Sequence, residues 1–265
     1  MMEMTIRDDD WVKDFLVCPK CLDKMSMTAW SSKPVQTSLL CVKCDTVYNI
    51  ENGIPIFNTF PTEGAREYRF EIDRYNKVAK TPPSEYKGFD ESYPKIRAKH
   101  LAGMIGNDEP VLNVGQGFGL LEKKMPLKMK YCLDLSIEFL RLVQKEEIPN
   151  TRLVMGFGEM MPFPDESMGA VVSDGVFQAV VNQREFLVEN ARVLKSGGTF
   201  ALTIPHKWNY PRKPQMFPVS NRKLLIHFLD ELEIDAKMDV YKLPDMRKSL
   251  MLADGDYTIF SGKKR

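Results

Sequence analysis

The chain has 265 residues, of which 43% are apolar and 28% are charged, and its formal net charge is +1. This composition excludes a disordered or collagen-like chain, and no apolar run is long enough to cross a membrane. The near-zero charge provides no overall attraction to nucleic acid or anionic lipid. The first residues lack the basic start and apolar middle of a secretory signal, so we expect a cytoplasmic protein.

Four of the five cysteines form two Cys-x-x-Cys pairs, Cys18/Cys21 and Cys41/Cys44, with nineteen residues between the pairs. Each pair places two thiolates at one tight turn, and two such pairs supply the four sulfur ligands that structural zinc prefers. The alternatives are redox chemistry or coincidence, but a redox Cys-x-x-Cys normally occurs alone. Four sulfur ligands leave no open position on the metal, so we expect a structural zinc site.

Residues 1–60 carry six Lys/Arg and eight Asp/Glu, a net charge of −2, which does not suit a module that binds phosphates. The segments 15–21, 40–44 and 48–56 resemble the Trm112-like zinc-ribbon family, and the ending Tyr-x-Ile-x-x-Gly-Ile-Pro is the specific part. Members of that family are separate partners that stabilise methyltransferases, or are fused in front of one. The resemblance therefore implies a small, β-rich zinc ribbon that contacts a protein partner or the rest of this chain.

Residues 61–100 are interrupted by prolines, so they cannot form one long helix. We expect a linker, a helix near 65–79, a loop, and a second helix from about 95 to 105. The aromatic side chains here either fix these helices to the main domain, which we favour, or line the mouth of a substrate site. They are Phe70, Tyr75, Tyr86, Phe89 and Tyr93.

Residues 110–114 have the composition of a buried strand, and Gly115-Gln116-Gly117-Phe118-Gly119 and a short helix at 120–125 follow at once. A strand, a glycine turn and a helix let the backbone approach a nucleotide closely. The next strand ends at Asp134, nineteen residues after Gly115, where a carboxylate can accept both ribose hydroxyls. The alternative for Asp134 is the N-cap of a helix that begins near Ser136.

Further along the chain, strands alternate with helices. We expect strands at 151–155, 170–173 and 199–204, and a helix at 183–195 that Gly197 and Gly198 end. Strands that alternate with helices indicate a parallel sheet covered on both faces.

Three segments in order resemble the class I S-adenosylmethionine-dependent methyltransferases: 111–119, the loop 161–167 and 192–198. The resemblance implies an α/β fold, a Rossmann-like seven-stranded, mostly parallel sheet with helices on both faces, and S-adenosyl-L-methionine as cofactor. We therefore expect a zinc ribbon in residues 1–60, a helical linker or cap in 61–100, and a methyltransferase domain in 101–265.

By this resemblance the glycine loop passes under the methionine part of the cofactor and Asp134 binds the ribose. Gly158 and Glu159 lie along the adenine, and Ser173 lies beside the sulfonium. The cofactor-binding candidates are Asn113, Gly115, Gly117, Gly119, Asp134, Leu135, Gly158, Glu159 and Ser173.

Some positions depart from the family pattern. Asn113 and Phe157 stand where the family has acids that contact the cofactor's ammonium and adenine, and Gly169 replaces an aspartate. Together these changes imply weaker cofactor binding or a catalytically silent copy.

Residues 207–223 contain five Lys/Arg and no acid, interleaved with aromatic residues. This stretch either suits a phosphate-bearing substrate or a single-stranded nucleic acid, or is a solvated loop. Its substrate-side candidates are Lys207, Trp208, Tyr210, Arg212 and Lys213, and His206 is the candidate general base. His100 and His227 fall on expected helix faces, which indicates packing or surface positions.

The resemblance implies transfer of a methyl group to an oxygen or nitrogen atom of a small or conjugated metabolite. One alternative is an RNA methyltransferase, which the zinc module and the basic stretch favour and the acidic ribbon opposes. The other alternative is a non-catalytic protein that binds the cofactor or a partner.

Overall fold

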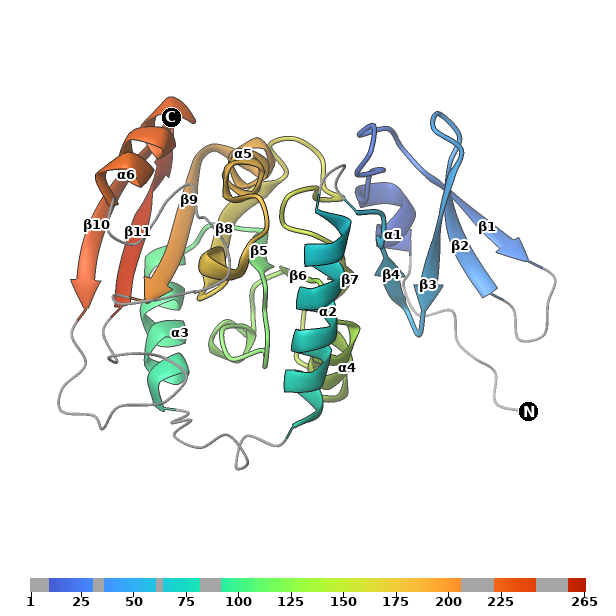
Figure 1. Ribbon diagram of the computed structural model, residues 1–265, viewed down its shortest axis with the longest axis horizontal. Helices are drawn as coiled ribbons and strands as arrows, with labels where there is room; N and C mark the ends of the chain where they lie inside the picture. The colour runs from blue at the N-terminus through green and yellow to red at the C-terminus, as the bar shows by residue number, and fades with distance from the viewer. Residues whose placement is uncertain (1–9, 31–35, 61–63, 82–91, 206–221, 242–256) are drawn as a thin grey trace.

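The computed structural model describes residues 10–30, 36–60, 64–81, 92–205, 222–241 and 257–265 (Figure 1). The helices are α1 (Asp10–Phe15), α2 (Ala65–Lys80), α3 (Ser92–Ile105), α4 (Ile137–Lys145), α5 (Gln183–Val193) and α6 (Arg222–Glu231). The strands are β1 (Ser26–Trp30), β2 (Gln36–Cys41), β3 (Thr46–Glu51), β4 (Ile54–Ile56), β5 (Val111–Val114), β6 (Lys130–Asp134), β7 (Thr151–Met155), β8 (Met168–Asp174), β9 (Leu194–Pro205), β10 (Ile234–Tyr241) and β11 (Tyr257–Lys264).

The strands of the described residues form one sheet in the order β1-β2-β3-β4-β7-β6-β5-β8-β9-β11-β10. From β7 to β10 this is the seven-stranded, mostly parallel sheet that the sequence predicts. β7, β6, β5, β8 and β9 pair in parallel, and β11 is antiparallel to both of its neighbours. The strand order reverses between β5 and β8, and open α/β sheets bind their ligands at such a switch point.

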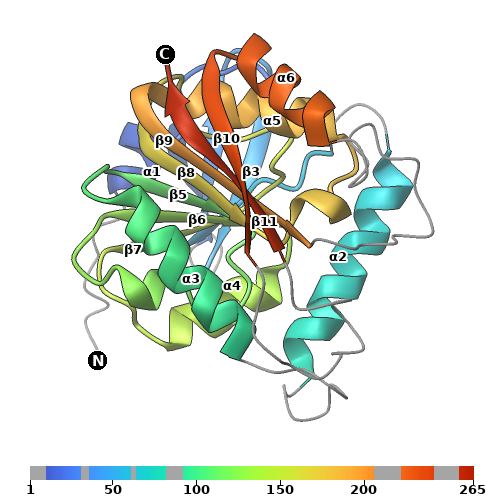
Figure 2. The ribbon, with the colours of Figure 1, turned by 90° about the vertical axis from the view of Figure 1, so that its left-hand side faces the viewer.

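Helices cover both faces of the sheet. Figure 2 shows α5 and α6 on one side of the strands and α3 and α4 on the other. Side chains alternate between the faces as the two-residue period of a strand requires. Leu112 and Val114 of β5 pack in the cluster that contains α5 and α6, whereas Val111 packs with α3. The buried strands therefore have apolar residues at consecutive positions, which explains their unbroken apolar composition.

The ribbon is continuous with the rest of the sheet. β4 pairs in parallel with β7 through Ile56 and Met155, and the Phe57 N–H donates a hydrogen bond of 2.8 Å to the Met155 carbonyl. The ring of Phe15 in α1 stacks on Tyr131 of β6, with 4.7 Å between the centroids. The buried side chains of the ribbon and of the larger sheet belong to one apolar cluster. Folding of the two parts is therefore coupled through a shared core.

Several local expectations need correction. The short helix expected at 120–125 is a single 3-10 turn, Glu122–Lys124. Helix α5 ends at Val193, and Gly197 and Gly198 lie inside β9 instead of capping the helix. The buried Leu194 already pairs with Met168 of β8, which forces the chain into extended geometry there. The second helix of the linker begins at Ser92, so that Pro94 falls in its first turn, where proline is tolerated.

In the described part of the chain, no helix combines the length and the apolar character needed to cross a membrane.

Candidate functional site

A pocket opens at the carboxyl ends of the parallel strands β5, β6, β7 and β8. It holds about 840 Å³ of space free of protein atoms, including the part open to solvent. Its walls come from the glycine loop, the ends of β6 and β8, the turn after β7, and helix α2. The lining residues are Tyr68, Glu71, Tyr75, Val114, Gly115, Gly117, Leu133, Asp134, Leu135, Phe139, Gly156, Gly158, Glu159, Asp174, Gly175, Val176, Ala179, Val180, Val181 and Phe186.

Glycines allow the chain to pass close to this pocket. Gly115 has φ +77°, and a Cβ there would lie 2.3 Å from the side chain of Val176. A Cβ at Gly158 would lie 2.6 Å from the ring of Phe186. A larger residue at either position would force the pocket wall to move, because heavy atoms do not approach so closely.

Asp134 is a buried acid of the pocket that backbone groups hold in place. Its carboxylate accepts hydrogen bonds from the backbone N–H groups of Ser136 (2.8 Å) and Gly117 (3.3 Å). Burial raises the pKa of Asp134 from its ordinary value of 3.8 to about 6, against the lowering effect of these two N–H groups. The N-cap of α4 is Ser136, whose Oγ accepts from the Phe139 N–H, so the alternative assignment of Asp134 as that cap is wrong.

Glu159 closes the side of the pocket that follows β7. Its Oε1 accepts hydrogen bonds from the backbone N–H groups of Val181 (3.0 Å) and Asn182 (3.3 Å). Burial raises the pKa of this carboxyl group. The ring of Phe157 does not line the pocket and packs edge-on against Tyr68, with 5.0 Å between the centroids.

Helix α2 supplies a wall that the sequence patterns did not identify, apart from Tyr75 among the aromatic candidates. Tyr68, Glu71 and Tyr75 line the pocket from this helix. α2 is fixed to α4 by Asn76, whose Oδ1 accepts a hydrogen bond of 2.7 Å from the Ser136 hydroxyl. Tyr68 and Glu71 are three residues apart and therefore share one helix face. This spacing was the only feature of the sequence that could have predicted that both line the pocket.

The pocket is acidic. Glu71, Asp134, Glu159 and Asp174 line it, and among its described lining residues none is Lys, Arg or His. Such a lining favours a ligand that carries positive charge.

Six of the nine cofactor-binding candidates line this pocket: Gly115, Gly117, Asp134, Leu135, Gly158 and Glu159. Gly119 does not line it. Ser173 is buried and its hydroxyl donates to the Val114 carbonyl, so that the next residue, Asp174, faces the pocket instead. His206, Lys207, Trp208, Tyr210, Arg212 and Lys213 lie outside the described residues.

Asn113 also lies behind the pocket wall. Its Nδ2 donates a hydrogen bond of 2.6 Å to Glu122 Oε1, and the Cys132 thiol donates to the same oxygen. Burial raises the pKa of Glu122, which is fully enclosed. Glu122, in the 3-10 turn that follows the glycine loop, therefore pairs with Asn113 inside the core and does not line the pocket.

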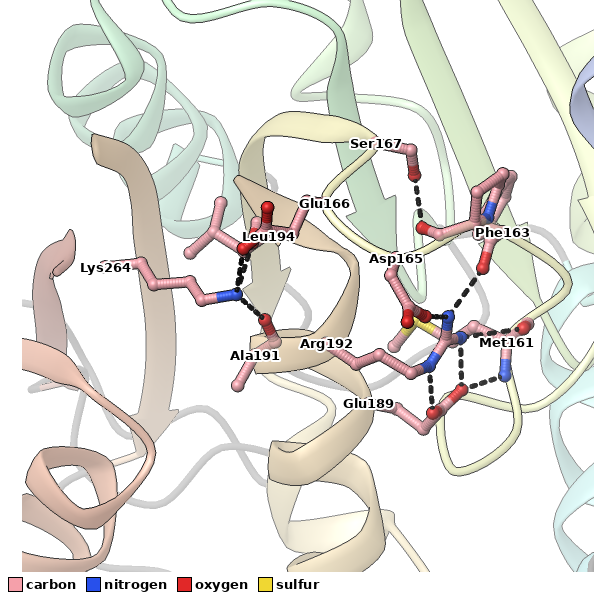
Figure 3. Close-up of polar contacts among 11 residues, drawn as sticks. Met161, Phe163, Asp165, Glu166, Ser167, Glu189, Ala191, Arg192, Leu194 and Lys264 are labelled. Atoms are coloured by element: carbon pink, nitrogen blue, oxygen red, sulfur yellow. Dashed lines mark hydrogen bonds and ion pairs between the residues drawn. The ribbon is translucent and has the colours of Figure 1, made fainter. Parts of the chain in front are cut away.

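The loop at residues 161–167 and the end of helix α5 are joined by polar contacts (Figure 3). The Arg192 guanidinium bonds to Glu189 (2.6 Å), Asp165 (2.8 Å) and the carbonyls of Met161 and Phe163. These contacts link the Met-Pro-Phe-Pro-Asp loop to the arginine of the following helix.

Lys264 of β11 closes the end of α5. Its Nζ donates to the carbonyls of Ala191 (3.0 Å) and Leu194 (2.9 Å) (Figure 3). Lys264 thus caps the C-terminus of α5, the role expected of Gly197 and Gly198, because a cation at a helix C-terminus can bind the carbonyl groups that have no partner within the helix.

The four ribbon cysteines converge on one point. Their sulfur atoms all lie within 4.8 Å of one another, with Cys18 and Cys44 3.5 Å apart and Cys21 and Cys41 3.4 Å apart. A tetrahedral zinc with Zn–S bonds of about 2.3 Å separates its sulfurs by about 3.8 Å, so the donor set and spacing fit zinc. The chain's fifth cysteine, Cys132, is buried, and none of the five forms a disulfide.

Part of the chain is similar to proteins of known families. Residues 112–202 match the family described as Methyltransferase domain. A demethylmenaquinone methyltransferase of Chlorobaculum parvum is 31% identical over 150 residues, which cover 55% of this chain and 59% of that protein. The chain spans about half the length of the curated relatives it matches.

Two solved structures share the fold. One is a chain from the complex of the Haloferax volcanii Trm112 methyltransferase activator with a methyltransferase (TM-score 0.57, 17% identity, 74% of this chain and 97% of that one). The other is the geranyl diphosphate C-methyltransferase of Streptomyces coelicolor A3(2), solved with Mg²⁺, geranyl diphosphate and S-adenosyl-L-homocysteine (TM-score 0.57, 13% identity, 77% and 100%). Residues 112–202 therefore match the methyltransferase domain family, and the chain shares its fold with the two solved structures.

Proposed function

We propose that this chain is an S-adenosylmethionine-dependent methyltransferase. The observation that carries the proposal is the acidic pocket at the ends of four parallel strands, with a glycine loop on one side and Asp134 at the tip of the neighbouring strand. S-adenosylmethionine carries a sulfonium and an ammonium group, and an acidic lining without basic residues favours both. The family match in residues 112–202 supports the same conclusion.

Different residues of the pocket are suited to bind different parts of the cofactor. Asp134 accepts the ribose hydroxyls, because its carboxylate lies at the carboxyl end of β6. Gly115 and Gly117 leave room for the methionine part, and Gly158 and Glu159 lie along the adenine. Bound there, the cofactor supplies an activated methyl group, and the protein positions the acceptor for in-line transfer.

The acceptor that we favour is an oxygen or nitrogen atom of a small or conjugated metabolite. The Chlorobaculum parvum relative, whose name specifies demethylmenaquinone, supports the small-molecule part of this proposal, and the choice of an oxygen or nitrogen acceptor comes from the sequence resemblance alone. The ribbon's net charge of −2 opposes a phosphate-binding role for that module. We place the reaction in the cytoplasm, since none of the five cysteines forms a disulfide, which suits a reducing compartment.

We also propose that the ribbon binds one structural zinc ion and acts within the chain as a support for the pocket. Phe57, directly after β4, lies 3.6 Å from a Cβ placed at Gly156 of the pocket wall. The ring of Phe60 packs on Phe157 (5.5 Å) and on Tyr68 (6.2 Å). One structural neighbour comes from a complex with a separate Trm112 activator, and the fused ribbon provides such support in cis.

Isothermal titration calorimetry tests the proposal with S-adenosylmethionine and S-adenosylhomocysteine as ligands. We expect saturable, one-to-one binding of both. The absence of binding up to millimolar ligand would reject the proposal. Binding of both ligands, but no methyl transfer to any acceptor, would identify a silent cofactor-binding protein.

A further inference from the structure

A second pocket opens where the ribbon meets the larger sheet, at the junction of β4 with β7 (Figure 1). It holds about 510 Å³ of space free of protein atoms, including the part open to solvent. Its walls come from α1, the turn before β4, the end of α4 and the beginning of β7. Among the described residues it shares no lining residue with the pocket that contains Asp134, so it is a separate site.

This second pocket exists because a proline interrupts the pairing of β4 with β7. The two strands pair at a single position, Ile56 with Met155, where the Met155 carbonyl accepts a hydrogen bond from the Phe57 N–H. In the same register, the Leu153 carbonyl would need the N–H of Pro55, and proline has none. The pairing therefore stops, and Leu153 lines the gap that results. The proline that ends the ribbon motif thus opens the pocket.

Arg152 of β7 provides the positive charge in this pocket. Its guanidinium lies over the ring of Trp11, with 4.9 Å between Cζ and the ring centroid, and both residues line the pocket. Nη1 is enclosed by the protein and has no hydrogen-bond partner. In the described part of the chain, no group accepts a hydrogen bond from Arg152 and no carboxylate forms an ion pair with it. Glu147, the one acid of the described lining, is exposed.

A partly buried cation without an acceptor destabilises the folded protein. Native proteins pair almost all of their buried donors, so an unpaired guanidinium indicates a group that serves a ligand. The Trp11 ring offsets part of the cost, because its face attracts a cation, but it accepts none of the N–H groups in the plane of the guanidinium. The donors of Arg152 are therefore available to an acceptor that enters the pocket.

We propose that this pocket binds a small carboxylic acid with a short apolar chain, with its carboxylate on Arg152. A guanidinium that lies over an indole keeps its edge free, and the parallel N–H groups there match the two oxygens of a planar carboxylate. Val143, Ile148 and Leu153 also line the pocket and provide apolar surface for the chain. Arg152 is the single cation of the described lining, which balances a monocarboxylate but not a phosphate dianion.

Such a ligand contacts both parts of the chain. Trp11 belongs to the ribbon, whereas Val143 belongs to α4. The next residue, Gln144, already joins the two parts, because its Nε2 donates a hydrogen bond of 2.8 Å to the Asn52 carbonyl in the ribbon turn. The site exists only when the ribbon is docked on α4 and β7, so a ligand should bind the folded chain alone and raise its melting temperature.

Sodium butyrate is the probe that tests the proposal, and butyramide is its neutral counterpart of the same size. For a ligand of this size we expect a dissociation constant of about 5 mM. Butyrate at about 50 mM should then raise the melting temperature of the full chain by about 3–5 °C in scanning calorimetry, relative to sodium chloride of equal ionic strength. Butyramide and sodium phosphate should produce much smaller shifts.

Three variants assign the effect to Arg152. Arg152→Met keeps a long side chain on Trp11 and should weaken butyrate binding at least about tenfold in titration calorimetry. Without ligand it should melt no lower than the wild type, because it removes a charge that has no partner. Arg152→Lys keeps the charge but not the planar fork, and should give an intermediate affinity. Arg184→Met is the matched control, since Arg184 also lies over a ring, that of Phe228 at 5.7 Å, and should leave butyrate binding unchanged.

Equal shifts with butyrate and butyramide would overturn the inference, because the charge would then play no part. Butyrate binding that survives in Arg152→Met would also overturn it. If Arg152→Met does not fold, Arg152→Lys decides, and an affinity equal to that of the wild type counts against the proposal. A phosphate shift as large as the butyrate shift would overturn the assignment to a carboxylate. None of these outcomes depends on the methyltransferase proposal.

Discussion

The raised pKa of Asp134 predicts that cofactor affinity depends on pH. Hydroxyl groups donate hydrogen bonds to the ionised carboxylate, so the ligand prefers that form. With a pKa of about 6 in the free protein, roughly one tenth of the molecules are ionised at pH 5 and nine tenths at pH 7. The apparent dissociation constant scales inversely with the competent fraction, so affinity should rise about tenfold from pH 5 to pH 7.

Titration calorimetry with S-adenosylhomocysteine at pH 5, 6 and 7 measures this effect. Measurements at pH 6 in two buffers of different ionisation enthalpy should also show release of about half a proton on binding. Asp134→Asn should abolish the pH dependence and bind at least tenfold more weakly than the wild type at pH 7.

Glu159 is the other pocket acid whose pKa burial raises, so Glu159→Gln is the matched control. It should retain the tenfold change if Asp134 is responsible. A wild-type affinity that stays flat between pH 5 and pH 7, or a pH dependence that survives in Asp134→Asn, would refute the reasoning.

Three further predictions concern other parts of the chain. Cys18→Ser should lower the zinc content from one ion per chain to near zero and lower the melting temperature, as measured by elemental analysis and circular dichroism. Arg192→Met should lower the free energy of unfolding by about 3–5 kcal/mol in urea titrations, since it leaves the largely buried Glu189 carboxylate without its cation and with only the Met161 N–H as a donor among the described residues. Changing Lys207, Arg212 and Lys213 together to Ala should not change how strongly the protein is retained on immobilised single-stranded RNA. If the wild-type protein is retained in a salt-dependent way and the variant is not, the result would instead support an RNA methyltransferase.

The parts of the fold that follow from local patterns were predictable from sequence. β5 and β6 are buried on both faces, so consecutive apolar residues mark them, and Gly115 follows where only a glycine fits. The spacing of the cysteines was sufficient to predict that four thiols converge. The distance from the glycine loop likewise predicted that Asp134 ends the next strand at the binding site, and this residue does line the pocket.

The remaining features depend on packing between distant segments. β8 continues one residue beyond its expected end. Because side chains alternate along a strand, Asp174 lines the pocket, whereas the Ser173 side chain is buried away from it. Helix α2 is held at the pocket by contacts with distant segments, among them the Asn76–Ser136 hydrogen bond to α4 and the packing of Tyr68 on Phe157. The pairing of β4 with β7 joins the ribbon to the larger sheet, and no local sequence pattern specifies which strands of two separate segments will pair.

A crystal structure of the protein grown with millimolar S-adenosylhomocysteine tests the central claim most directly. The account predicts density in the pocket, with the ribose hydroxyls on the Asp134 carboxylate and the amino-acid tail along Gly115 and Gly117. An empty pocket at that concentration, or a ligand bound elsewhere, would contradict the account.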